Sequence, residues 1–122
     1  EYATFQNAGY MGLYGGETVS DIHARKGLAP TQKILDYMNS SELAANLFRI
    51  TLADDKIKKE GISNAEDATL AHSIAGAEVR GAIERANGTL PENQPTPIKS
   101  VEQIAREQIA ELKKRKKKML DE

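Results

Sequence analysis

The stretch from Asn39 to Gly61 constrains the fold of this chain more than any other. Asn39 can cap a first helical turn, and Glu42 stands where the second partner of a capping box belongs. A cluster of lysines precedes Gly61, which suits the negative end of a helix and its left-handed stop. These signals predict one long helix with well-defined ends.

The same stretch carries an apolar pattern with helical spacing. Leu43, Leu47 and Ile50 recur at steps of four and three, and Ala44 and Phe48 lie beside them. Only a helix brings these positions onto one face. We therefore expect this face to be buried, with each large side chain contributing about 2 kcal/mol.

Further helical patterns flank this element on both sides. They are predicted at 2–7, 18–26, 30–38, 64–87 and 100–122. The helix at 64–87 is expected to lie antiparallel against 40–60, because the connection between them is short. Its expected buried stripe is Ala68, Ala71, Ala75, Val79, Ala82 and Ala86, flanked by Leu70, Ile74 and Ile83.

These patterns predict an all-α fold, a compact bundle of about five helices of which two are short and three longer. An irregular Gly/Tyr-rich segment is expected at the N-terminus. The domain layout is a helical domain at 1–90, a Pro-rich linker or surface strap at 91–99, and an amphipathic helix with a basic end at 100–122. Because the chain opens on Glu1, we expect a fragment of a longer protein.

Four of the six aromatic residues fall in the first 16 positions, among four glycines. Tyr10 and Tyr14 are candidate partner contacts if the segment is a shaped loop. The alternative is an aromatic plug packed against the helices, which we favour because aromatics dominate the cores of small domains.

The two short helical patterns joined by KGLAP resemble a helix-turn-helix. In that interpretation Gln32 and Lys33 open a recognition helix, while Arg25 and Lys26 meet phosphates. The alternative is an ordinary helical corner with solvated charges, which a net charge of −1 favours.

A run of six basic residues lies near the end of the chain. The run consists of Lys113, Lys114, Arg115, Lys116, Lys117 and Lys118. It is either an electrostatic contact for nucleic acid or a soluble tail. The helix that carries it can return to its own domain, pair with a second copy in a homo-oligomer, or dock onto a partner.

Several chemistries have no support in the sequence. Cysteine is absent, and His23 and His72 stand alone, without spaced ligands for a metal. We expect both histidines at the surface or its boundary. No cofactor loop or activated nucleophile is recognisable, so we expect no enzyme activity, metal or cofactor. No stretch is apolar enough to cross a membrane, and we expect a cytoplasmic protein.

Three blocks carry a family resemblance: GYMGLYGG, IHARKGL and SSELAANLFR. The chain resembles the C-terminal part of the DNA-damage-inducible protein D (DinD) family. The resemblance implies a bacterial, SOS-induced protein that follows an N-terminal BRO-like domain. It also implies a partner, RecA or the RecA filament on single-stranded DNA, and inhibition of strand exchange.

Two functional hypotheses therefore remain. The first is a non-enzymatic protein-interaction domain that modulates RecA filaments, and it depends on the resemblance. The second is a DNA-binding regulator of the phage antirepressor type that uses the helix-turn-helix-like segment. Steep salt dependence of DNA binding would distinguish the second from the first.

Overall fold

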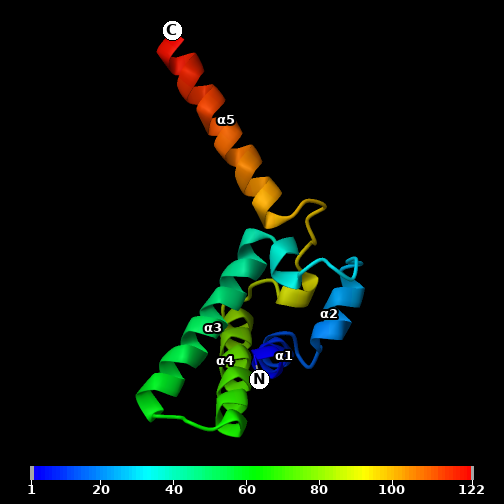
Figure 1. The fold of residues 1–122 in the computed structure, drawn as a ribbon, viewed down its shortest axis with the longest axis vertical. Coiled ribbons are helices and arrows are strands. Elements are labelled where there is room, and N and C mark those ends of the chain that lie inside the picture. The colour runs from blue at the N-terminus through cyan, green and yellow to red at the C-terminus, as the bar shows by residue number, and fades with distance from the viewer. Residues whose placement is uncertain (1, 122) are drawn as a thin grey trace.

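The computed structural model describes residues 2–121, and the regular elements in this range are all helical. They are the α-helices α1 (Tyr2–Leu13), α2 (Val19–Arg25), α3 (Ser40–Glu60), α4 (Ala65–Arg85) and α5 (Val101–Asp121), with the 3-10 turns η1 (Ile34–Tyr37) and η2 (Pro91–Asn93). The predicted all-α class is confirmed. Figure 1 shows α3 and α4 as a helical hairpin, with α1 beside α4. Helices α1 to α4 form the body of the molecule, and α5 extends away from it.

Helix α3 begins and ends where its sequence predicts. The Asn39 side chain accepts a hydrogen bond of 2.9 Å from the Glu42 backbone N–H. At the other end Gly61 adopts a left-handed conformation with φ of 61°, which an L side chain disfavours. The Glu42 carboxylate does not complete the capping box, because it hydrogen-bonds inside the protein.

The predicted buried face of α3 is wrong for Ala44, Leu47 and Phe48, while Leu43 and Ile50 are half-buried and Leu43 packs against the core. The buried residues are Glu42, Asn46, Arg49 and Ala53, whereas Leu47 and Phe48 are 52% and 56% exposed. Helix α3 turns its polar face inward because α1 and α2 supply hydrogen-bonding and charged partners for it there. Burial of a polar face is tolerated when its groups are paired in this way.

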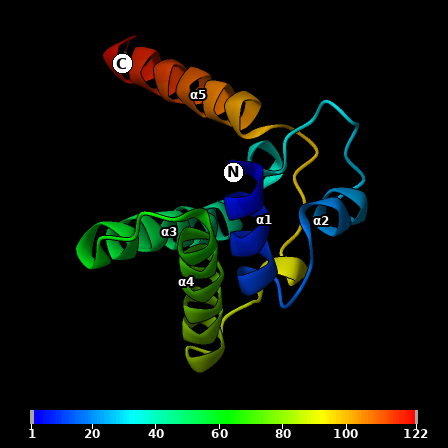
Figure 2. The ribbon, with the colours of Figure 1, turned by 60° about the horizontal axis from the view of Figure 1, so that its bottom comes forward.

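The N-terminal segment is a helix rather than an irregular loop. Gly9 and Gly12 lie inside α1, where their missing side chains let other groups approach. A Cβ on Gly12 would lie 2.3 Å from the Ser73 carbonyl oxygen, and one on Gly76 would lie 2.4 Å from the Gly9 carbonyl oxygen. The backbones of α1 and α4 therefore touch, and Figure 2 shows the two helices side by side.

The small-residue stripe of α4 is buried as predicted over most of its length. Ala68, Ala71, Ala75 and Val79 are buried, together with Gly76 and His72. The end of the predicted stripe is wrong, because Ala82 and Ala86 are exposed. Leu70 and Ile74, which were expected to flank the stripe, are 56% and 39% exposed. Helix α4 uses this stripe chiefly to contact α1, and secondarily α3.

The main apolar cluster joins α1, α2, η1 and α4. Its buried members are Tyr10, Leu13, Tyr14, Ile22, Ile34, Met38 and Val79. Helix α2 contributes through Ile22 and begins with a capping box between Thr18 and Asp21. The cluster therefore centres on the end of α1 and not on α3.

The predicted helix at 30–38 is not formed. The Gln32 side chain accepts a 2.7 Å hydrogen bond from the Ala29 backbone N–H, which holds Pro30 and Thr31 in a turn. Only the short 3-10 turn η1 follows, from Ile34 to Tyr37. The second helix of the helix-turn-helix interpretation is therefore absent from this segment.

The Pro-rich segment follows the body as a strap before α5. Pro91 is buried, and the Gln94 side chain accepts a 2.7 Å hydrogen bond from Asn39. Helix α5 then starts with a capping box between Ser100 and Gln103. Both views show it leaving the body (Figures 1 and 2). None of the described helices is long and apolar enough to cross a membrane.

Candidate interaction surface

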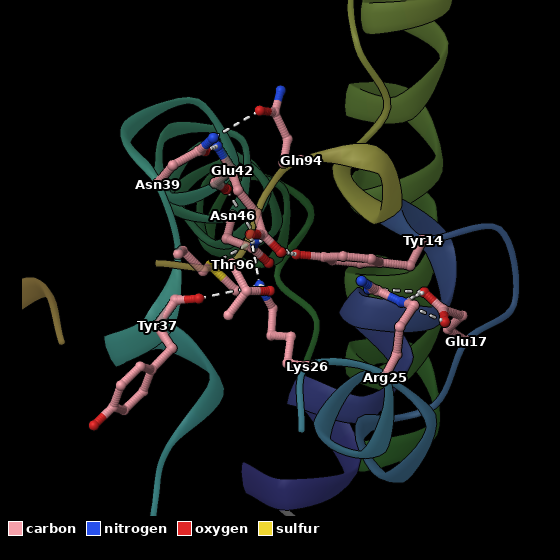
Figure 3. A network of polar contacts seen from close by, with 11 residues as sticks. Tyr14, Glu17, Arg25, Lys26, Tyr37, Asn39, Glu42, Asn46, Gln94 and Thr96 are labelled. Carbon is pink, nitrogen blue, oxygen red and sulfur yellow. Dashed lines mark hydrogen bonds and ion pairs between the residues drawn. The ribbon is translucent and has the colours of Figure 1, made fainter. Parts of the chain in front are cut away.

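A buried carboxylate lies at the centre of the body. Glu42 is 1% exposed, and its Oε1 accepts a 2.8 Å hydrogen bond from Lys26 Nζ in a fully buried ion pair. Its Oε2 accepts a hydrogen bond from the Tyr14 hydroxyl. Figure 3 shows Tyr14, which directly follows α1, and Lys26, at the end of α2, converging on Glu42. One side chain of α3 thus joins the first two helices.

Lys26 also secures the two segments that surround this ion pair. Its ammonium donates to the Tyr37 carbonyl oxygen at 3.1 Å and to the Thr96 hydroxyl at 3.3 Å. The strap is therefore held to the buried pair through Thr96 as well as through Gln94. All three ammonium protons have partners, as a buried lysine requires.

A second part of the network continues along α3 toward α1. Asn46 donates to the Tyr14 hydroxyl at 3.0 Å and accepts from Arg49 Nε at 2.9 Å. The Arg49 guanidinium lies 4.4 Å from the centre of the Tyr10 ring, a cation–π contact, and donates to Gln6. The N-terminal segment thus supplies partners for the inward polar face of α3, except that Arg49 Nη1 is buried without a hydrogen-bond partner.

Burial shifts the proton affinities of these groups. Burial raises the pKa of Tyr10 to about 12, although the charge of Arg49 opposes this change. Burial and the hydrogen bond to Glu42 raise the pKa of Tyr14 further. Burial lowers the pKa of Arg49. The tyrosines therefore stay neutral, and the network has the character of a structural clamp whose central groups are buried.

The two tyrosines predicted as partner contacts lie inside this clamp. Tyr10 is 5% exposed and Tyr14 is 2% exposed, so neither is presented to a partner. The aromatic-plug interpretation holds for these two residues, whereas Tyr2 at the start of the segment is 74% exposed. Glu42, Asn46 and Arg49 share one helical face at steps of four and three, but the apolar face of the same helix gives the stronger local signal for burial.

The residues predicted to contact DNA from the short helix pair are dispersed. Lys26 is buried, and Arg25 pairs with Glu17 at 3.0 Å. Gln32 donates to the Tyr37 hydroxyl at 2.9 Å, while Lys33 is exposed. The structure does not bring these four side chains to one surface.

The basic run is arranged differently. All six of its residues are exposed on α5: Lys113, Lys114, Arg115, Lys116, Lys117 and Lys118. Arg115 alone among them pairs with a carboxylate within residues 2–121, to Glu111 at 3.3 Å. The run is therefore a concentrated positive surface at the far end of the molecule.

The two histidines lie apart. His23 is half-buried and hydrogen-bonds the Gln32 carbonyl oxygen at 3.0 Å. His72 is 8% exposed and stacks on Phe5 with ring centres 5.3 Å apart, so its expected surface position is wrong. Burial lowers the pKa of His72. Across residues 2–121 we find no group of three or more side chains that could hold a metal ion.

An open apolar groove runs between α3 and α4 on the body. It has a volume of about 620 Å³, and the segment after α4 closes one end of it. Most of its lining is apolar, including Ala44, Phe48, Val79, Ala82, Ile83 and Ala86, while Ser41, Glu42, Thr89 and Gln94 add polar groups. Phe48 projects from α3 at its edge and is 56% exposed. Exposed aromatic side chains beside apolar grooves are typical anchors for protein partners. The sequence pattern missed this groove because it assigned Phe48 to the core.

Comparison with known proteins identifies relatives of the chain. The family model described as "DinD C-terminal domain" matches residues 1–104. The "DNA damage-inducible protein D" of Escherichia coli (strain K12) is 49% identical over 104 residues, which are 85% of this chain and 38% of that protein. The chain thus spans well under half of the relative's length. No solved structure matches it.

Proposed function

The chain belongs to the DinD C-terminal domain family, and from this membership we propose that it is a non-enzymatic protein-interaction domain of a DNA-damage response factor. The partner we propose is RecA assembled as a filament on single-stranded DNA. Binding there would limit the filament and inhibit strand exchange. Family membership is the observation that carries this proposal.

The α3–α4 groove is the surface of the body that best suits a protein partner. It lies within the matched residues 1–104, and most of its lining is apolar. Phe48 offers an exposed aromatic side chain, and Leu47 beside it is 52% exposed. Burying such side chains is the main source of affinity at protein interfaces. We therefore propose that RecA contacts this groove.

The helix-turn-helix alternative receives no support from the geometry. Its recognition helix is replaced by a turn and η1, and Lys26 is committed to the buried pair with Glu42. Sequence-specific base contacts need several side chains presented together in a groove of the DNA. The short helix pair does not present such a set, so we favour the RecA proposal over the antirepressor-type regulator.

Binding of the chain to three targets tests this proposal. The targets are RecA alone, RecA filaments on single-stranded DNA, and the same DNA without RecA, each at about 50 and about 300 mM salt. An apolar protein contact resists this change in salt, whereas contacts with phosphates weaken steeply. We expect binding to the filament to persist at the higher salt while binding to bare DNA does not.

The opposite pattern would overturn the proposal. If binding to filaments weakens with salt in parallel with binding to bare DNA, the filament offers nothing beyond its DNA. If the chain binds neither RecA target, this domain does not carry the RecA contact.

A further inference from the structure

The basic end of α5 lies outside the part of the chain that matches the family. The family match ends at residue 104, whereas the run of six basic residues begins at Lys113. Figure 1 shows this part of α5 extending well beyond the body. Its role can therefore be considered separately from the groove and from the RecA proposal.

The charge density of the run is close to that of duplex DNA. An α-helix rises about 1.5 Å per residue, so consecutive cations lie about 1.5 Å apart along its axis. Double-stranded DNA carries one negative charge per about 1.7 Å of its axis. Six like charges at this spacing repel one another, and a polyanion of similar density relieves that repulsion.

The first half of α5 shows how the same helix balances charge elsewhere. There Arg106 pairs with Glu102 at 2.6 Å, one turn away. After Glu111 no acidic residue occurs until Asp121, so the run is left with a large positive excess. Favourable interaction with the helix dipole accounts only for cations in the last turn, and the run begins about two turns earlier.

The run also disfavours a helical protein partner along this half of α5. Successive residues turn by about 100°, so six cations in sequence reach every face. The apolar stripe stops at Leu112, which is 60% exposed, and resumes at Met119, which is 75% exposed. A helix–helix interface needs an apolar side chain at each turn, and the charged side chains of the run interrupt the apolar stripe of α5.

We propose that residues 113–118 of α5 form a nucleic-acid arm that binds the phosphate backbone of double-stranded DNA without sequence preference. The partner is the duplex because its charge density matches the run. The run has no aromatic side chains for stacking on single-stranded bases. The arm lets the domain engage DNA beside a partner that is bound at the body.

Neutralisation of three lysines on one face tests the arm. Lys114, Lys117 and Lys118 lie at steps of three and one, on the side of α5 away from Leu112. The variant K114Q/K117Q/K118Q keeps helix propensity because Gln and Lys are similar helix formers. Binding of the 122-residue chain to two unrelated duplexes is measured by fluorescence anisotropy between about 50 and about 200 mM salt.

The matched control neutralises three lysines in the last two turns of α3. The variant K56Q/K58Q/K59Q changes net charge equally, but Lys56 and Lys59 already pair with Glu60 and Asp55. Each phosphate contact contributes about 0.9 to the slope of log affinity against log salt. We expect the arm variant to lower the magnitude of this slope by up to about 2.7, and the control to leave it unchanged.

Three results would overturn the arm. The first is an absence of salt-dependent duplex binding by the unmodified chain. The second is an equal loss in both variants, which would mean that only net charge matters. The third is tighter binding to vesicles of phosphatidylserine and phosphatidylcholine than to either duplex, which would assign the run to lipid. None of these results bears on the salt-resistant filament binding that tests the proposed function.

Discussion

Glu42 joins segments that are far apart in the sequence. Its carboxylate accepts from Lys26 and Tyr14, and Lys26 in turn reaches Thr96 of the strap. A buried ion pair contributes little compared with an apolar pair, but loss of one partner leaves an uncompensated charge. The integrity of the body therefore depends on this carboxylate more than on any surface ion pair.

Glu42→Gln tests this dependence. It leaves the Lys26 charge buried without its counter-charge, and we expect the free energy of unfolding to fall by about 3 kcal/mol or more. Urea denaturation measures the change. The control is Glu17→Gln, which breaks the partly exposed pair with Arg25 and should cost about 0–1 kcal/mol. Equal effects of the two substitutions would contradict the clamp.

His72 gives the body a dependence on mild acid. Burial lowers its pKa, so the folded protein favours the neutral ring while the unfolded chain retains the usual value of about 6.5. This contribution to stability is complete above pH 6.5 and decreases as the pH falls below it. We expect the urea midpoint to fall between pH 7.5 and 5.5.

The variant His72→Phe provides the control, because an aromatic ring can still stack on Phe5 but cannot be protonated. Its urea midpoint should change less over the same pH range. An equal pH dependence in both proteins would assign the effect to other groups.

At the level of elements, the α1–α4 contact determines how closely the body packs. Gly12 and Gly76 face the opposite backbone, and neither has room for a Cβ. Such a contact tolerates no added methyl group unless one helix moves. The position of α1, and hence of Tyr14, depends on this approach.

Gly76→Ala and Gly81→Ala should have opposite effects on stability. Alanine is a better helix former than glycine by about 1 kcal/mol at either position. At Gly76 the new Cβ would clash with the Gly9 carbonyl oxygen, and we expect a net loss of about 1–3 kcal/mol. At Gly81 it would meet only the movable end of Arg85, so a small gain is expected. Thermal denaturation measures both, and destabilisation of similar size at the two sites would contradict the close contact.

Local signals predicted the ends of the helices well. Caps at Asn39 and Gly61 depend on neighbouring residues, and they delimit α3 as expected. The inward face of α3 could not be predicted in the same way. Hydrophobic periodicity favours Leu47 and Phe48, whereas the partners of Asn46 and Arg49 come from α1 and the residue after it, more than 30 residues away.

The two candidate surfaces, the basic run and the groove, also differ in how far the sequence could predict them. Exposure of the basic run is a property of composition, because no fold could bury six adjacent cations on a helix. The groove beside Phe48 arises only after α3 has turned its polar face inward, so no local pattern could reveal it. The turn at Pro30 likewise depends on the Gln32 side chain competing with the helix.

At the scale of the molecule, the body and α5 present two surfaces of different chemistry. The groove is apolar and lies within the family match, while the basic run extends beyond residue 104. We propose that the groove binds the RecA filament and that the arm adds contact with DNA. Salt separates the two contributions, because screening weakens the arm far more than it weakens apolar burial.

The most direct measurement is the affinity of the chain for RecA filaments at about 300 mM salt, compared between Phe48→Ser and Leu70→Ser. Both side chains are 56% exposed, so neither substitution should unfold the body, but only Phe48 lines the groove. Loss of a buried aromatic contact of about 1.5–3 kcal/mol corresponds to roughly 10- to 100-fold weaker binding. We predict that loss for Phe48→Ser and less than about a twofold change for Leu70→Ser. Equal affinities for the two variants, or no binding by the unmodified chain, would contradict the account.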